Sequence, residues 1–252
     1  MRRLQLPDET GLVPFVPAVP PGGRWLVLAP HADDETLGPG ATLSLAAARG
    51  VAVKVVVITD GAEQGSRDER EAEATEAMRW LGLGRPTFLR FPDRGLLDLL
   101  DRLRGEIRTL LDREAPDHLF VTSPVELHPD HRALALAVHR EIGRRTCWGL
   151  RASSPEWLSA YEVAAPLRPT MLVAADAAWD AKKNAAACYR SQVARHPYLE
   201  VMEALGALRS LTLDGVHRAE AFHTLPALRL GRLSARQWAA EMGSPAGVTS
   251  PR

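Results

Sequence analysis

The strongest constraint on the fold of this chain is a repeated alternation of short apolar runs with longer amphipathic segments. Residues 25–29 (WLVLA) and 51–58 (VAVKVVVI) have the composition of buried strands, and the second run is rich in β-branched side chains. Similar runs occur at 86–91 and 118–122. Helices are predicted between and after them, at 40–50, 67–83, 96–111 and 132–142. This order predicts an α/β fold with a mostly parallel sheet and right-handed crossovers.

The alternation weakens after about residue 150. Further strands are predicted at 161–165 and 171–175, and further helices at 176–189 and 199–208. The whole chain is then predicted to contain an irregular N-terminal arm (1–24), a single α/β domain (25–230) and a partly flexible C-terminal tail (231–252).

Composition limits the partners of the chain. The 31 basic and 31 acidic residues cancel, so no net charge attracts nucleic acid or an anionic lipid surface. No apolar run approaches the roughly 20 residues that a membrane span needs. The first residues, MRRLQLPDETG, place acidic residues and Pro where a signal peptide has its apolar core. We therefore expect a cytoplasmic protein that acts on a small molecule, with no nucleic-acid partner and no membrane span.

Two clusters of polar residues follow predicted strands directly. His31, Asp33 and Asp34 come after the first strand, and His128 and His131 come after the fourth. Ligands of open α/β sheets bind beyond the carboxyl ends of the strands, so both clusters lie where a site is expected. Imidazole and carboxylate groups are suitable ligands for zinc. A carboxylate left over can act as a base, and a second imidazole can face the substrate.

Each cluster alone has an ordinary structural explanation. Asp33, Asp34 and Glu35 would suit the start of a helix, where negative charge is favoured, and Asp130 would suit a helix cap. Together, at two strand ends, the clusters favour a metal site. Two histidines and one carboxylate leave a coordination position open, which is typical of catalytic zinc. The same donor set also suits Fe²⁺.

The motifs PHADDE (30–35) and HPDH (128–131) together resemble those of the LmbE-like, or PIG-L, N-acetylglucosaminyl deacetylases. The resemblance extends from about residue 25 to 223 and includes ITDGAEQG (58–65), FPDRGL (91–96) and ACYRSQ (187–192). It implies a Rossmann-like sheet with helices on both faces. Ala32 replaces a proline that is usual in the first motif, but this proline supplies no ligand, so we expect the metal site to be retained.

Carried over residue by residue, the resemblance implies that His31, Asp34 and His131 hold Zn²⁺. It implies that Asp33 is the general base that activates water. It also implies that His128 stabilises the oxyanion and protonates the leaving amine.

The resemblance further implies that Arg70 and Asp93 contact the substrate. An alternative for Arg70 is a surface helix position paired with Glu73 or Glu76, and Arg67 is an alternative substrate contact. Trp148, Trp157, Tyr161 and Arg168 are candidates for the cavity wall.

The implied activity is zinc-dependent removal of an acetyl group from the amide nitrogen of an N-acetylglucosamine-type conjugate, which releases acetate. One alternative is a metal-dependent amidase or esterase acting on a non-sugar acylated small molecule. A nucleotide-binding or transferase domain is disfavoured, because G-x-G-x-x-G is absent after the first strand and no G-x-x-x-x-G-K-[ST] loop occurs. A catalytically silent metal protein would have no use for Asp33 and His128.

Overall fold

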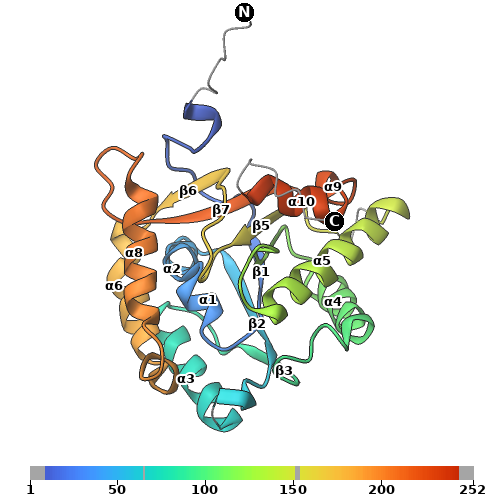
Figure 1. Cartoon of the computed structure of the whole chain (residues 1–252), viewed down its shortest axis with the longest axis horizontal. Coiled ribbons are helices and arrows are strands. Elements are labelled where there is room, and N and C mark those ends of the chain that lie inside the picture. Colours follow the sequence, from blue (N-terminus) through green and yellow to red (C-terminus); the bar gives the residue numbers. More distant parts are fainter. Residues whose placement is uncertain (1–8, 65, 151–153, 244–252) are drawn as a thin grey trace, which may run out of the picture.

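A computed structural model describes residues 9–64, 66–150 and 154–243 of the chain. Within these residues, one seven-stranded sheet has the order β3-β2-β1-β4-β5-β7-β6 (Figure 1). The strands are β1 (Arg24–Ala29), β2 (Ala52–Thr59), β3 (Thr87–Phe91), β4 (His118–Thr122), β5 (Trp157–Tyr161), β6 (Met171–Ala174) and β7 (Ala219–Pro226). Strands β1 to β5 pair in parallel, whereas β7 runs antiparallel to both β5 and β6. The predicted α/β fold with a mostly parallel sheet is confirmed.

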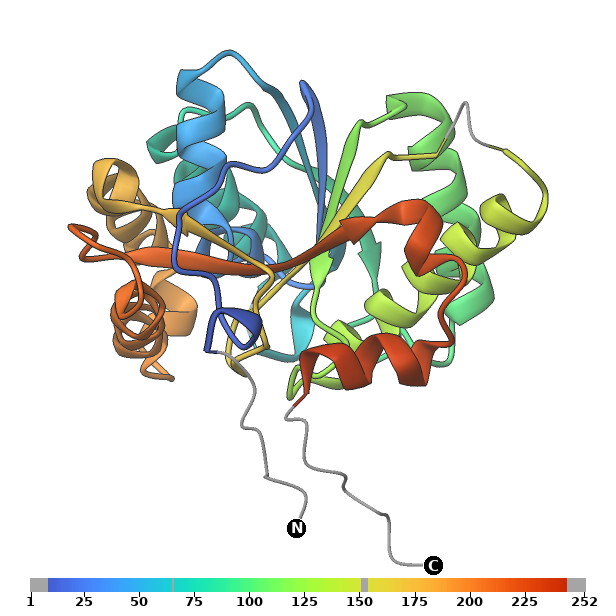
Figure 2. The ribbon, with the colours of Figure 1, turned by 90° about the horizontal axis from the view of Figure 1, so that it is seen from above.

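Helices cover both faces of the sheet, as Figure 2 shows. They are α1 (Asp34–Leu37), α2 (Gly40–Ala48), α3 (Arg67–Trp80), α4 (Leu100–Glu114), α5 (Pro129–Cys147), α6 (Asp176–Ala187), α7 (Arg190–Val193), α8 (Tyr198–Ser210), α9 (Ala227–Leu230) and α10 (Ala235–Met242), with 3-10 turns η1 (Glu9–Gly11) and η2 (Ala62–Gln64). Trp25 and Val27 of β1 pack with α2, α3 and α6, whereas Leu26 and Leu28 pack with α4 and α5. This alternation along a buried strand explains why β1 is apolar throughout.

The sheet has a topological switch point between β1 and β4. From β1 the chain proceeds outward to β2 and β3, and it then returns to the other side of β1 to form β4 and β5. The loops that leave β1 and β4 at their carboxyl ends therefore diverge, which opens a crevice at this edge. Trp25 pairs with His118 and Leu28 with Val121, so the residues that follow the two strands emerge side by side.

The predicted strand at 161–165 is wrong, because β5 ends at Tyr161. The backbone N–H groups of Val163, Ala164 and Ala165 donate to the carboxylate of Glu126 and are not available to a neighbouring strand. Strand β7, whose sequence AEAFHTLP mixes polar and apolar residues, was not predicted.

The predicted C-terminal tail begins with an ordered helix. Ser234 and Gln237 form a capping box at the start of α10, and Trp238 and Met242 are buried in the core. The packed domain thus extends beyond residue 230 to at least Met242. In the described part of the chain, no helix is both long and apolar enough to cross a membrane.

Candidate metal centre

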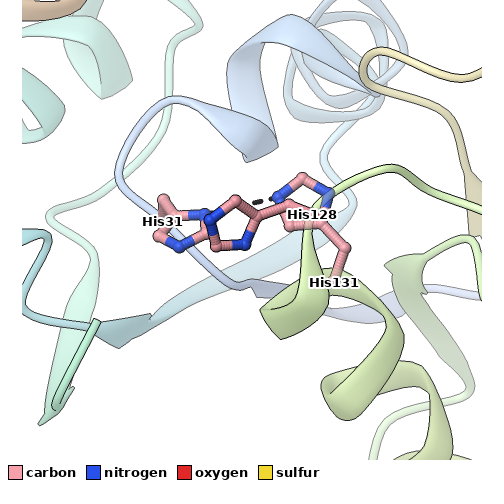
Figure 3. Close-up of side chains that lie close together, drawn as sticks. All are labelled: His31, His128 and His131. Carbon is pink, nitrogen blue, oxygen red and sulfur yellow. Dashed lines mark hydrogen bonds between the residues drawn. The ribbon is translucent and has the colours of Figure 1, made fainter. Parts of the chain in front are cut away.

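Three donor atoms converge at the switch point. His31 lies in the loop after β1, Asp34 is the first residue of α1, and His131 lies in the first turn of α5. His31 Nδ1 is 3.2 Å from Asp34 Oδ2 and 3.3 Å from His131 Nε2, and His131 Nε2 is 3.1 Å from Asp34 Oδ2. Figure 3 shows the ring of His31, in the loop after β1, turned toward the ring of His131 at the start of α5.

The size of this triangle fits a small cation. In a tetrahedral zinc site with bonds of about 2.0 Å, ligand atoms lie about 3.3 Å apart. The three separations of 3.1, 3.2 and 3.3 Å match this value. A set of His31, His128 and His131 is also close enough for a metal, with donor atoms within 4.8 Å of one another. The set that includes Asp34 is tighter and supplies a negative charge.

Electrostatics also favour a cation at this point. Burial opposes ionisation of Asp34, but the charges and hydrogen bonds of His131 and His31 outweigh burial and hold the Asp34 pKa well below its usual range. For His131, burial disfavours the charged ring, yet Asp34 raises the pKa to about 9. The carboxylate thus stabilises positive charge on the donor set, whether protons or a metal ion carry it.

Further carboxylates orient the His31 ring from its other side. His31 Nε2 lies 3.2 Å from Asp93 Oδ1 and 3.4 Å from Asp130 Oδ2. The Asp130 carboxylate also accepts the backbone N–H groups of Arg94 (2.6 Å) and Leu96 (3.2 Å). Carboxylates beside the outer nitrogen of a ligating histidine favour a proton there, so Nε2 would carry the proton and Nδ1 would bind the cation. His31, Asp93 and Asp130 are themselves close enough for a metal, with donor atoms within 4.8 Å of one another. Asp93 also lines the cavity described below, where a substrate could reach it. Its contact with the substrate stays a prediction.

Asp33 has an unusual backbone and a perturbed carboxyl group. Its φ of 141° lies in a region that favours glycine, and such strain is often found at functional sites. Burial raises its pKa to about 7, and Asp34 adds to this shift, while the Arg70 guanidinium opposes it. Arg70 Nη2 lies 3.5 Å from Asp33 Oδ2 and donates to the Ala32 carbonyl at 2.7 Å. Arg70 is buried, so the alternative of a surface helix arginine is wrong.

His128 is the N-cap of α5. Its Nδ1 accepts the backbone N–H of Asp130 at 3.2 Å, so the neutral ring carries its proton on Nε2. Burial, with the charges of His31 and His131, lowers the His128 pKa to about 4. The ring meets His31 edge-on, with centroids 4.5 Å apart.

These groups surround a cavity of about 410 Å³. It is lined by His31, Asp33, Asp34, Leu37, Arg70, Asp93, Arg94, Glu126, Leu127, His128, Pro129, His131, Val163, Ala164, Gln192 and Tyr198. All seven predicted site residues are among them. The four residues predicted for its wall are not. Trp148 is 76% exposed, Trp157 is the first residue of β5, Tyr161 is buried beneath the site, and Arg168 lines a different cavity.

Buried anchors that the sequence did not reveal hold the first motif in place. The Glu35 carboxylate accepts hydrogen bonds from the hydroxyl groups of Tyr189 and Thr36. Ser191 donates through its backbone N–H and its hydroxyl group to Glu73 of α3, at 2.9 and 2.7 Å. The segment ACYRSQ thus joins the first motif and α3 to the C-terminal third of the chain.

The structure combines a Rossmann-like α/β sheet with a cluster of two histidines and one carboxylate at its switch point. Residues 26–141 match the family model described as PIG-L, GlcNAc-PI de-N-acetylase. This part of the chain, which contains both motifs, belongs to the PIG-L, or LmbE-like, family, as the motifs predict.

Known relatives are similar over different lengths. A 1D-myo-inositol 2-acetamido-2-deoxy-alpha-D-glucopyranoside deacetylase of Mycobacterium avium is 35% identical, over 36% of this chain and 37% of that protein. The chain thus spans little more than a third of this curated relative. A conserved protein from Thermus thermophilus is 34% identical, with a TM-score of 0.69, over 80% of this chain and 94% of that one. An N,N'-diacetylchitobiose deacetylase from Pyrococcus horikoshii (23% identical, TM-score 0.70, 82% and 85% covered) shares the fold.

Proposed function

We propose that this chain is a zinc-dependent N-deacetylase that hydrolyses the acetamide of an N-acetylglucosamine-type conjugate and releases acetate. The observation that carries the proposal is the triangle of His31, Asp34 and His131 donor atoms beside the buried Asp33 carboxyl, on the floor of one cavity. The deacetylase names of relatives in the same family support it.

These three residues would hold Zn²⁺, and Fe²⁺ also suits the donor set. When bound, the metal supplies Lewis acidity toward the acetyl carbonyl and the attacking water. Side chains of the protein would carry out the proton transfers and help to stabilise the charge on the acetyl oxygen.

Asp33 is the proposed carrier of the proton. Its carboxylate takes a proton from the attacking water as the new C–O bond forms at the acetyl carbon. A pKa of about 7 suits this role, because the group is then ionised often enough to accept the proton and acidic enough to release it. Arg70, 3.5 Å away, fixes the orientation of the carboxylate.

His128 is the proposed donor to the acetyl oxygen. Negative charge builds on this oxygen as water attacks, and the Nε2–H of the neutral ring stabilises it by a hydrogen bond. With a pKa of about 4, the ring is neutral near pH 7 and is a poor acid. We therefore assign protonation of the leaving amine to Asp33 rather than to His128, which differs from the role that the sequence resemblance implies. The C–N bond then breaks to give acetate and a free amine.

The walls of the cavity suit a sugar conjugate. Arg70, Asp93, Gln192 and Tyr198 supply polar groups for hydroxyls, and Leu37, Val163 and Ala164 supply apolar surface. A non-sugar acylated small molecule remains the alternative substrate, because the same catalytic groups would act on it.

The test is acetate release from N-acetylglucosamine conjugates and from N-acetylated amines without a sugar, before and after removal of metal with a chelator. We expect deacetylation of the sugar conjugates, loss of activity after chelation, and recovery with Zn²⁺. Activity that survives complete metal removal would rule out the proposed chemistry. Hydrolysis of the non-sugar amides alone would favour the alternative substrate.

Two variants separate the neighbouring carboxylates. Asp33→Ala should abolish turnover while the protein keeps its metal, and Asp34→Ala should lose the metal. If Asp33→Ala lost the metal instead, the roles of the two residues would be reversed.

A further inference from the structure

Glu126 is a buried carboxylate that the proposed reaction does not use. It lies between β4 and α5, two residues before His128, and it is 1% exposed. It also borders the cavity. An ionised carboxylate in such a place needs strong hydrogen bonds or a cationic neighbour, since burial alone disfavours its charge.

One side of this carboxylate is taken up by a backbone loop. Oε1 accepts the N–H of Val163 at 2.6 Å and those of Ala164 and Ala165 at 3.2 and 3.3 Å. Val163 and Ala164 are part of the cavity wall. Glu126 thus fixes the loop that forms this wall.

The other oxygen of Glu126, Oε2, faces a predicted metal ligand as well as the loop. It accepts the N–H groups of Ala164 and Ala165 at 3.3 Å each, and it lies 3.7 Å from Nδ1 of His131. This Nδ1 is buried and has no hydrogen-bond partner among the described residues. The opposite ring nitrogen, Nε2, is the one that faces Asp34 and His31. A carboxylate on the outer nitrogen of a ligating histidine fixes the protonated nitrogen and the ring orientation.

We propose that Glu126 is a positioning residue that holds His131 with its proton on Nδ1 and connects this ligand to the cavity wall. A small approach of the two groups, from 3.7 Å to hydrogen-bond distance, completes the contact. Glu126 does for His131 what Asp93 and Asp130 do for His31. The proposal rests on the proposed metal-dependent function.

Glu162 offers a matched control on the same loop. It is also buried (6% exposed), and its Oε2 accepts the N–H of Leu167 at 3.0 Å and pairs with Arg209 at 2.6 Å. It therefore orders the loop through Leu167 and Arg209, and in the described part of the chain its carboxylate makes no hydrogen bond or ion pair with a histidine. Glu162→Gln measures how a less ordered loop changes Zn²⁺ affinity. Glu126→Gln measures the same change together with the loss of the contact to His131.

The experiment measures Zn²⁺ affinity by competition with a chelator for the full-length wild type, Glu126→Gln and Glu162→Gln. We expect Glu126→Gln to weaken Zn²⁺ binding roughly 10- to 100-fold, the range usual for loss of such a partner. Glu162→Gln should stay within about threefold of wild type. Equal binding by Glu126→Gln and wild type, or equal weakening in both variants, would overturn the proposal.

A second measurement uses only the wild-type protein, so it does not require that any variant folds. In a long-range ¹H–¹⁵N spectrum of the Zn²⁺-loaded wild type, we expect the Nδ1 of His131 to be protonated and its Nε2 to carry the metal. An unprotonated Nδ1 would overturn the role of Glu126. If the wild type binds no Zn²⁺ at all, the proposed function itself fails, which distinguishes the two failures.

Discussion

The raised pKa of Asp33 predicts how activity depends on pH. If the Asp33 carboxylate accepts a proton from water, only enzyme with this group ionised is active. Burial raises its pKa to about 7, so kcat/KM should rise with pH through the neutral range and then level off. The sign follows from the role as a base, because protonation at low pH removes the acceptor.

The magnitude follows from the titration of a single group. With a pKa of 7, about 9% of Asp33 is ionised at pH 6 and about 91% at pH 8, which is a tenfold rise in kcat/KM. A divalent cation beside Asp34 adds positive charge and lowers the Asp33 pKa. The midpoint in the metal-loaded enzyme should therefore lie at or below 7, with unit slope on its acid side.

The assay is acetate release at substrate concentrations far below KM, between pH 5 and 9, with metal content checked at each pH. The same profile tests His128, whose pKa lies near 4. A reaction that needed protonated His128 would slow steadily as pH rose above 4. A fall in kcat/KM between pH 6 and 8 would refute Asp33 as the base and restore His128 as the acid.

Three further perturbations test other parts of the structure. Asp34→Asn should raise the Zn²⁺ dissociation constant roughly 100-fold or more, as measured by chelator competition, because the donor set loses its anionic member. Lys182→Met should destabilise the protein by about 3–5 kcal/mol in urea unfolding, because Glu220, 2.6 Å from Lys182 Nζ, would lose its buried partner. In metal-free protein, Asp33→Asn should raise stability by up to about 4 kcal/mol above pH 7, where the wild-type folded state must ionise a buried group whose unfolded pKa is about 3.9. This gain should disappear as pH falls toward 4, and unfolding curves at both pH values would check it.

Sequence periodicity predicted β1 to β4 and β6 well, but it misplaced β5 and missed β7. β1, β2, β3 and β4 lie within a residue or two of the predicted apolar runs. β1 and β4 are buried almost throughout, and a strand with both faces buried is apolar along nearly its whole length. β7 is antiparallel and joins β5 to the edge strand β6, and it carries Glu220 and His223. Both side chains are buried and partnered from other elements, which a strand pattern read from its own residues does not reveal.

The two clusters that contain the candidate ligands were identifiable from strand-end placement, whereas the choice of Asp34 over Asp33 and of His131 over His128 came from the family resemblance. His31 and Asp34 follow β1, and His131 follows the neighbouring strand β4. Because the two strands are parallel, their carboxyl ends lie side by side. The residues that support these ligands leave no such signal. Glu126 accepts hydrogen bonds from a loop almost 40 residues further along the chain, and the Tyr189 hydroxyl donates to Glu35 across 154 positions.

The conformation and burial of Asp33 reduce the free energy of unfolding, which explains why several buried hydrogen bonds surround this residue. Asp33 has a backbone conformation that favours glycine. Its carboxyl group is buried, which raises its pKa to about 7. The strained backbone opposes folding by about 1–3 kcal/mol, and the raised pKa opposes it by up to about 4 kcal/mol at neutral pH. Neighbouring contacts must therefore impose the loop geometry, and the Arg70 bond to Ala32 and the Glu35 contacts with Tyr189 and Thr36 do so from both sides of Asp33. A loop selected only for stability would have a glycine at position 33, so the aspartate there is best explained by the chemistry of its carboxyl group.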